Sequence, residues 1–314
     1  MNMCSKCRST PVLSTRRDLE GQETSDRHSM RHSRLWTILI DIPLIIIVVA
    51  LIGLFEIGVI PSHRAGFFCN DQSLAFPYRG DTVSTSVLVS TIFLAPLIVI
   101  LVTELIFQEQ EYNYREKTIA SMKNTLWVYR NYIYGMIFNF AVIEIMKGIT
   151  GSPRPTFFYI CEPDTGKTCN GSEFVSTFEC TSTRFSKWMQ NDSYHSFPSG
   201  HTSLSVHCGL FIAWYLQKRA FDWRFRTVFV VPLVQLICIS FAAISSLTRI
   251  TDRRHHWWDV VIGFVIGLFT FLYAAIVLSR GSAINRTEKP ISSSIHQSVK
   301  SLIYNPRTID SVSP

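Results

Sequence analysis

Long apolar stretches alternate with polar segments along most of this 314-residue chain. A helix needs about 20 apolar residues to cross the hydrocarbon core of a bilayer. Six stretches reach or approach that length; the shortest, 204–216, is extended by the Ser- and Thr-containing turn before it. We therefore predict an all-α fold with six transmembrane helices in one bundle, over residues 35–60, 87–107, 126–146, 204–216, 228–247 and 260–278.

The polar tails define the predicted domain limits. Residues 1–34 and 281–314 are rich in Ser, Thr and Arg, so both are expected to be disordered tails around a six-span domain at 35–280. The chain starts without the pattern of a secretory signal, so its first span should be an uncleaved anchor.

Composition supports a membrane protein. Charged residues make up 17% of the chain, below the roughly 25% of soluble domains, and hydrophobic residues make up 47%. This excludes a disordered chain, and eight cysteines are too few for a disulfide-dense small domain. The net charge of +7 would suit nucleic acid, but the basic residues lie between the apolar stretches, so a bilayer is the expected partner and nucleic acid is not.

Lysine and arginine set the expected orientation. Six spans put both termini on one side, and that side carries nineteen basic residues against nine in the opposite loops. Because cytosolic loops are the more basic, both termini are predicted to be cytosolic. The long loop 149–200 then faces outward, and its sequons predict glycosylation at Asn170 and Asn191, whereas the sequon at Asn285 would be cytosolic and silent.

Four cysteines fall in the predicted outer loops. In an oxidising compartment they could form two disulfides with three alternative pairings, which the sequence leaves open. They are Cys69, Cys161, Cys169 and Cys180.

Three polar clusters lie at the outer ends of the predicted spans, where ionisable groups are costly and often functional. The first runs from Lys147 to Arg154-Pro155 and closes the third span; its glycines and prolines let the two cations converge. The alternative is that both are flanking charges that extend to the membrane interface.

The second cluster, 198–201, opens the fourth span. Ser199 is a candidate N-cap, Gly200 allows close approach of a ligand, and a helix N-terminus attracts anions such as phosphate. The alternative is a plain capped helix start with an interfacial histidine, His201.

The third cluster lies between the fifth and sixth spans and contains Arg249, His255, His256 and Asp259. His255 and Asp259 are four apart and share a helical face, so the carboxylate could hold one ring nitrogen protonated and leave the other free. His256 could make the same contact, and spacing does not choose between them. The alternative is an interfacial belt with the adjacent tryptophans.

Together the clusters offer cations, a helix N-terminus, histidines and an orienting carboxylate. This set suits a phosphate monoester, whose transfer needs positioning and charge neutralisation. The outer loops hold no carboxylate cluster for two divalent ions, so no metal or other cofactor is expected.

The three clusters resemble the signatures of the type 2 phosphatidic acid phosphatase superfamily: Lys147 through Pro155, Pro198 through His201, and Thr248-Arg249 through His255 to Asp259. Thr248 replaces the usual serine and keeps its hydroxyl. Over residues 35–280 the chain is similar to the lipid phosphate phosphatases.

The resemblance implies a magnesium-independent phosphatase at the outer face of the membrane, with lipid phosphates such as phosphatidate, lysophosphatidate, sphingosine 1-phosphate and ceramide 1-phosphate as substrates. It assigns the attack on phosphorus to His255, its orientation to Asp259, and protonation of the leaving alcohol to His201. The phosphate oxygens would be held by Lys147, Arg154, Ser199, Gly200 and Arg249.

Two other functions are compatible with a polytopic protein. A catalytically silent relative would bind lipid phosphate or act as a scaffold, and a transporter would line a pathway with its charges. The intact set of signature residues disfavours the first, and gathering at one face disfavours the second. The plasma membrane is the expected location, with internal membranes as the alternative. The G-x-x-x-G motif at Gly263 and Gly267 would permit close helix contact within the bundle or in a homo-oligomer.

Overall fold

The computed structural model describes residue 39 and residues 42–56, 59–60, 62–108, 114–169, 171–221 and 229–287. Residues 1–53 and 54–314 form two separate units. The predicted tail 1–34 lies outside the described residues. Helix α2 (Ile42–Glu56) is the described part of the first predicted span, and it is apolar all round.

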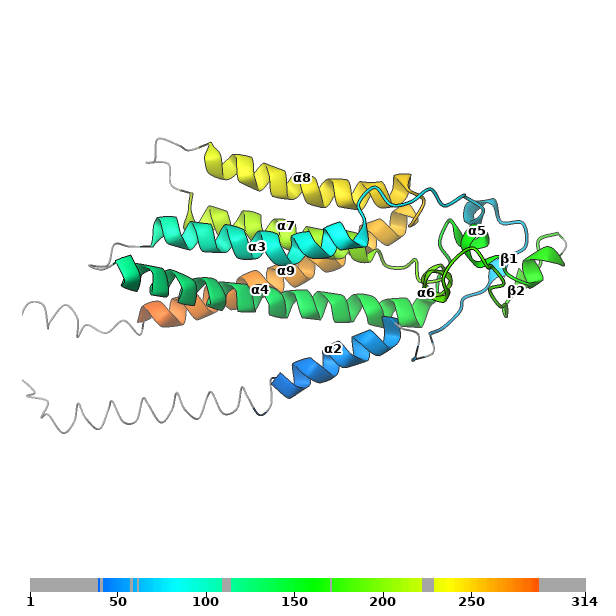
Figure 1. The fold of residues 1–314 in the computed structure, drawn as a ribbon, viewed down its shortest axis with the longest axis horizontal. Coiled ribbons are helices and arrows are strands. Elements are labelled where there is room, and N and C mark those ends of the chain that lie inside the picture. Colours follow the sequence, from blue (N-terminus) through cyan, green and yellow to red (C-terminus); the bar gives the residue numbers. More distant parts are fainter. Residues whose placement is uncertain are drawn as a thin grey trace, which may run out of the picture. The chain divides into compact units, whose positions relative to one another are not determined.

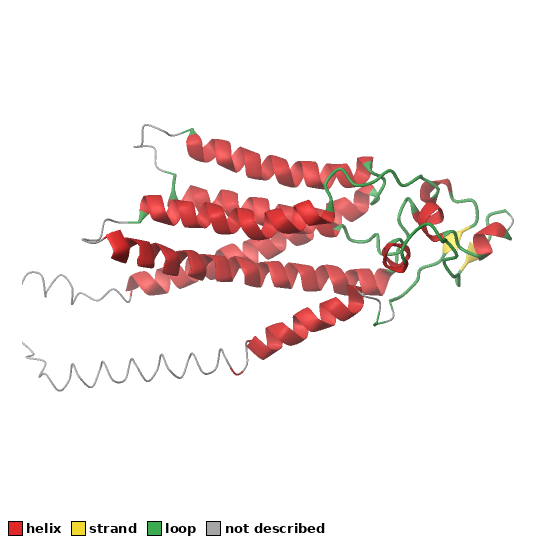
Figure 2. Ribbon diagram, viewed as in Figure 1, coloured by secondary structure: helices red, strands yellow, loops and turns green. Residues whose placement is uncertain are grey.

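The second unit contains five long helices and a small cap (Figure 1). The long helices are α3 (Thr85–Phe107), α4 (Tyr114–Thr150), α7 (Gly200–Arg219), α8 (Val230–Thr251) and α9 (Trp257–Thr287). Figure 2 shows that helices dominate, and the only described strands have two residues each. The mainly helical fold predicted from the sequence is confirmed.

By length and composition, four of the described helices could cross a membrane: α3, α4, α8 and the Trp257–Leu278 part of α9. They expose large apolar side chains, as lipid-facing helices do. Examples are Leu94, Ile98 and Ile106 on α3, Leu233 and Ile237 on α8, and Phe269 and Ile276 on α9.

Helix α7, the fourth predicted span, is the centre of the bundle. It contacts α3, α4, α8 and α9, and most of its residues are buried. Its Ser, Thr and Gly residues therefore face other helices rather than lipid, which explains why it falls short of the apolar content of a lipid-facing span.

The glycines of the G-x-x-x-G are used inside the bundle. A Cβ on Gly263 would lie 2.6 Å from the carbonyl oxygen of Ser199, and one on Gly267 would lie 2.5 Å from that of Ser203. Helix α9 therefore packs with its backbone against the first turns of α7, as small residues permit.

The end of the bundle opposite the cap contains an ion pair with a buried carboxylate. Glu104 on α3 accepts hydrogen bonds from Arg219 Nε at 2.9 Å and from the Tyr215 hydroxyl at 2.6 Å, both on α7. Because the buried carboxylate is paired and hydrogen-bonded, it fixes the ends of α3 and α7 together.

The cap is built from segments of two outer loops. Strand β1 (Phe67–Phe68) pairs antiparallel with β2 (Phe174–Val175). Two short helices, α5 (Phe157–Cys161) and α6 (Lys187–Asp192), and two 3-10 turns, η2 (Gln72–Leu74) and η3 (Thr165–Lys167), complete the cap. Phe67, Phe157 and Phe178 pack as a small aromatic core.

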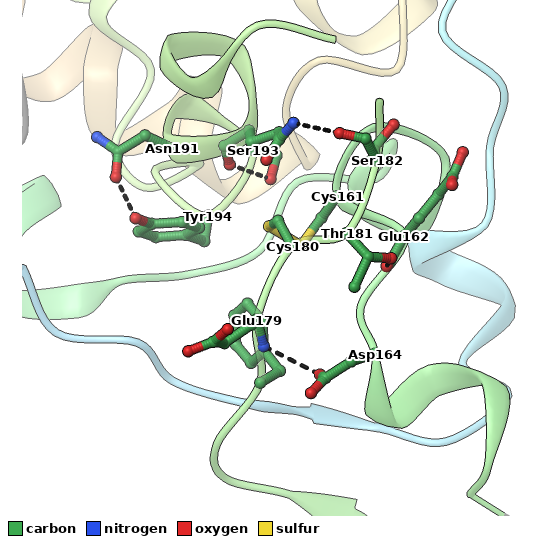
Figure 3. Close-up of a disulfide and its surroundings, with 12 residues drawn as sticks. Cys161, Glu162, Asp164, Glu179, Cys180, Thr181, Ser182, Asn191, Ser193 and Tyr194 are labelled. Atoms are coloured by element: carbon green, nitrogen blue, oxygen red, sulfur yellow. Dashed lines mark hydrogen bonds between the residues drawn. A yellow bond between two sulfur atoms is a disulfide. The ribbon is translucent and has the colours of Figure 1, made fainter. Parts of the chain in front are cut away.

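Two disulfides staple the cap. Cys69 bonds to Cys169 and joins the α2–α3 loop to the α4–α7 loop, whereas Cys161 bonds to Cys180 within the α4–α7 loop. Figure 3 shows the second bridge among loop residues that are tied by hydrogen bonds, such as Glu179 N to Asp164 Oδ1 at 3.0 Å. These bonds select one of the three pairings that the sequence left open.

All three polar clusters reach the capped end. There hydrogen bonds join the end of α4 to the segment before α7 (Thr150 to Phe197), α7 to α9 (Ser199 to Asp259), and the segment before α3 to the end of α8 (Thr82 to Asp252). At the other end of the chain, α9 continues to Thr287, beyond the limit at 280 that the sequence predicted. Its first proline, which cannot continue a helix, comes only at position 290.

Candidate active site

The first signature turns sharply after α4. Gly151 has φ +54°, and a Cβ there would lie 1.8 Å from the carbonyl oxygen of His63, so only glycine fits. Lys147, in the last turn of α4, lies 2.7 Å from Glu144 Oε1. The turn carries Arg154 back over the bundle end, where its side chain is buried.

Arg154 contacts three residues: Asp192, Arg254 and His255. Its Nη2 lies 2.5 Å from Asp192 Oδ1, and its Nε donates to the Asp192 carbonyl oxygen at 2.8 Å. Its Nη1 lies 3.1 Å from both the Arg254 carbonyl oxygen and His255 Nε2. Burial lowers the pKa of Arg154 and Asp192 opposes that effect. Burial would raise the pKa of Asp192, but Arg154 and Arg254 outweigh it and hold that pKa below its usual value.

The second signature forms the N-terminus of α7. Ser199 is its N-cap, and its hydroxyl accepts from Thr202 N at 3.4 Å and from the Thr202 hydroxyl at 3.0 Å. A Cβ on Gly200 would lie 4.0 Å from Lys147 Nζ. The lysine of the first signature therefore lies beside the helix start of the second, where free N–H groups favour an anion.

His201 is in the first turn of α7. Its Nε2 is buried and makes no hydrogen bond with the described residues. The ring lies within electrostatic range of Arg249, His255 and Arg154. A buried ring nitrogen without a protein partner is available to a ligand.

The third signature supplies His255 from the turn between α8 and α9. Its Nδ1 lies 2.7 Å from the carbonyl oxygen of Ser196, and its Nε2 lies 3.1 Å from the Arg154 guanidinium. A carbonyl oxygen only accepts and a guanidinium only donates, so Nδ1 carries the proton and the lone pair of Nε2 accepts a hydrogen bond from Arg154.

Asp259 and His255 face each other, as their spacing predicts, but their contact is longer than a hydrogen bond. Asp259 Oδ2 is 3.6 Å from His255 Nδ1, too far for a hydrogen bond, and 3.5 Å from His256 Nδ1. The same oxygen accepts from the Ser196 hydroxyl at 2.5 Å and from His256 N at 2.9 Å. Ser196 therefore stands between the carboxylate and the histidine, and spacing alone could not reveal it.

His255 is buried, with 4% of the residue exposed, and this burial shapes its electrostatics. Burial and the nearby Arg154 lower its pKa to about 3, although Asp259 acts in the opposite direction. The ring is consequently neutral at physiological pH, as a nucleophile must be.

Arg249, 1% exposed, is held mainly by the loop between α2 and α3. Its Nη1 lies 3.1 Å from Asp81 Oδ1, and its Nη2 donates to the Val83 carbonyl oxygen at 2.9 Å and to Asp252 Oδ2 at 3.3 Å. Asp81 and Asp192 could not be identified from the sequence, because neither belongs to a signature. Their only signal is that they are carboxylates in loops predicted to face outward, near clusters of cations.

The other predicted features fall around this centre. Asn191 lies on α6, where its side-chain oxygen accepts from the Tyr194 hydroxyl, and it lines a narrow pocket with Lys147, Trp188 and His195. Asn170 lies outside the described residues. Within the described part of the chain, no group of three or more His, Cys, Asp or Glu side chains is arranged to hold a metal ion.

The sequence of the chain is similar to those of known proteins. The model of the PAP2 superfamily matches residues 128–281, which include all three signatures. The chain is 30% identical to phospholipid phosphatase 2 of Bos taurus, over 74% of this chain and 80% of the relative. It is 28% identical to phospholipid phosphatase 1 of Mus musculus, over 77% and 86%.

No solved structure matches the chain. The similarity to the phospholipid phosphatases nevertheless extends over most of both chains and is accompanied by the convergence of the signature residues at one bundle end. The chain therefore belongs to the PAP2 superfamily and, within it, to the lipid phosphate phosphatase family.

Proposed function

We propose that the chain is an integral membrane phosphatase that hydrolyses phosphate monoesters of lipids through a phosphohistidine, without a metal ion. The observation that carries the proposal is the lone pair on His255 Nε2, which faces Arg154 while Ser196 keeps the proton on Nδ1. The names of its relatives, phospholipid phosphatases 1 and 2, support lipid phosphates as the substrate class.

In the first half-reaction, His255 Nε2 attacks phosphorus and the bond from phosphorus to the ester oxygen breaks. His201 donates a proton to that oxygen, so the lipid alcohol leaves neutral. The proton stays on Nδ1 throughout, in its hydrogen bond to the Ser196 carbonyl oxygen. Arg154, Lys147 and the N–H groups at Gly200 would bind the equatorial oxygens, whose charge must be neutralised.

In the second half-reaction, water attacks phosphorus and the bond to Nε2 breaks. His201, now neutral, accepts a proton from that water, and inorganic phosphate leaves. Arg249 and Ser199 complete the proposed phosphate-binding set. Arg249 binds the phosphate only if the phosphate displaces Asp81 and Asp252, its partners in this structure.

A lipid substrate fits the location of the site. The signatures lie at one end of helices that expose large apolar side chains, so a phosphate headgroup could enter while the acyl chains stay in the bilayer. Phosphatidate, lysophosphatidate, sphingosine 1-phosphate and ceramide 1-phosphate all have this form.

The proposal includes six crossings, cytosolic termini and an outward-facing site, at the plasma membrane. Two disulfides in the cap support an oxidising compartment on that side. Single Asn170→Gln and Asn191→Gln variants test the orientation by their gel mobility with and without glycosidase. Glycosylation at Asn285 instead would show that the protein has the opposite orientation in the membrane.

Phosphate release from a panel of lipid phosphates, by the full-length protein in detergent with excess chelator, tests the function. We expect turnover with chelator present and its loss in His255→Ala. His256→Ala is the matched control, since that neighbouring ring stacks on Trp258 at 4.6 Å and is not the proposed nucleophile. A folded wild-type protein that binds lipid phosphate without turnover would be a silent relative.

A further inference from the structure

We propose that Arg254, a residue outside the three signatures, is a positioning residue that ties both outer loops to the nucleophile. The inference rests on the proposed phosphatase function and deepens it. Arg254 directly precedes His255 and is 7% exposed, so its charge is buried beside the catalytic centre. A buried guanidinium is retained at such cost only with close partners.

The side chain of Arg254 joins two carboxylates from separate loops. Its Nε lies 3.1 Å from Asp81 Oδ1 in the first outer loop, and its Nη2 donates to Asp192 Oδ2 on α6 at 3.0 Å. Asp81 also pairs with Arg249, and Asp192 also pairs with Arg154. Arg254 therefore lies between the two carboxylates that hold the proposed phosphate-binding arginines.

The backbone of Arg254 contacts the same two arginines. Its N–H donates to the Arg249 carbonyl oxygen at 3.0 Å, and its carbonyl oxygen accepts from Arg154 Nη1 at 3.1 Å. That guanidinium nitrogen also contacts His255 Nε2. A shift of Arg254 would therefore move Arg154 and His255 relative to each other.

The turn before Arg254 needs such support. Arg253 has φ +56°, in the left-handed region, and with the bond from Arg253 N to the Ile250 carbonyl oxygen it closes α8 in a Schellman motif, where glycine is usual. The first loop covers this turn: the Tyr78 ring lies 5.1 Å from the Arg254 guanidinium, and Thr82 binds Asp252 through both N–H and hydroxyl.

Kinetics of Arg254→Gln in the full-length protein test the inference. We expect kcat for a lipid phosphate to fall about 30-fold or more with KM within about threefold, because a misplacement near 1 Å can cost about 100-fold in rate. Arg254→Lys should recover part of kcat, since one ammonium keeps the charge but cannot reach both carboxylates as the planar fork does.

Arg253→Gln is the matched control. It removes the same charge one residue earlier, from a side chain that lies over the Phe76 ring at 4.3 Å, and should change kcat by less than about threefold. Equal losses in both variants would overturn the inference, as would a rise in KM with unchanged kcat, which would make Arg254 a phosphate ligand. If Arg254→Gln fails to accumulate, Arg254→Lys decides: wild-type kcat contradicts the inference and a reduced kcat with normal KM supports it.

The two proposals fail separately. An inactive but folded wild-type protein would refute the phosphatase function, whereas an active wild type with unaffected Arg254 variants would refute only the positioning role. Melting temperatures of all variants show whether each loss of kcat occurs in a folded protein.

Discussion

The carbonyl oxygen of Ser196 lies 2.7 Å from His255 Nδ1, whereas the nearest carboxylate oxygen of Asp259 lies 3.6 Å away. The tautomer of the neutral ring, with its proton on Nδ1, is thus selected by a backbone carbonyl. In a triad whose carboxylate holds the histidine directly, an amide replacement selects the wrong tautomer and costs about 10,000-fold in rate.

Asp259→Asn should therefore be milder here, with a loss of about 10- to 100-fold in kcat, because Ser196 still accepts the Nδ1 proton. Ser196→Ala keeps the carbonyl and removes only the hydroxyl bond to Asp259, so its loss should be smaller still. Steady-state kinetics on one lipid phosphate check both. A loss near 10,000-fold in Asp259→Asn would show that the carboxylate, rather than Ser196, sets the tautomer.

The site could be predicted from the sequence where its residues lie on helix ends. Lys147, Ser199 and Asp259 follow from the signatures because a helix fixes the direction of each side chain within one turn. Asp81 and Asp192 could not be predicted, since their contact with Arg254 depends on the path of two long loops.

The fold shows the same division. Apolar length predicted α3, α8 and α9 because lipid imposes it on every face that it touches. It described α7 poorly, since a helix enclosed by other helices can be polar, and it could not pair Cys69 with Cys169, because loops leave that choice to tertiary packing.

His201→Ala tests the proposed acid through the leaving group. An alkoxide of high pKa needs a proton to leave, so the variant should lose about 100- to 1,000-fold in kcat on lipid phosphates. An aryl phosphate with an acidic phenol needs little help and should lose less than about tenfold. Equal losses on both substrates would contradict the acid role and indicate phosphate binding instead.

The lowered pKa of His255, about 3, predicts an unusual pH profile. Burial and Arg154 keep the ring neutral, Arg254 acts in the same direction and Asp259 opposes them, so the nucleophile stays unprotonated as the pH falls from 8 to 5. An ordinary histidine would be mostly protonated below about pH 6. The acidic limb of kcat/KM should therefore follow the ionisation of the substrate phosphate and shift between substrates. A limb fixed near pH 6.5 for every substrate would contradict the buried, neutral ring.

Gly263→Ala tests the packing that positions the second signature. The new Cβ would lie 2.6 Å from the Ser199 carbonyl oxygen, so α7 and α9 must separate, at a cost of about 1–3 kcal/mol. The melting temperature in detergent should fall and kcat should fall with it, because Ser199 N also donates to the Asp259 carbonyl oxygen at 3.0 Å. Gly53→Ala is the control, since nothing lies within 4 Å of its Cβ and no loss is expected.

The two disulfides should contribute separately to the cap. Cys169 lies inside the loop that Cys161–Cys180 closes. The Cys69–Cys169 bond therefore attaches the α2–α3 loop, which carries Asp81 twelve residues after Cys69, to an already closed segment. Removing a native bridge costs about 2–5 kcal/mol in small secreted domains, and the membrane-anchored helices between Cys69 and Cys169 should keep the cost near the lower limit. We expect Cys69→Ser/Cys169→Ser to lower the melting temperature and also kcat, because the loop that holds Arg249 and Arg254 is released at one end.

The double variant Cys161→Ser/Cys180→Ser should lower mainly the melting temperature. The control is Cys238→Ser, which replaces an unbonded thiol. An unchanged kcat in the first double variant would mean that Asp81 and Thr82 hold the loop without the bridge.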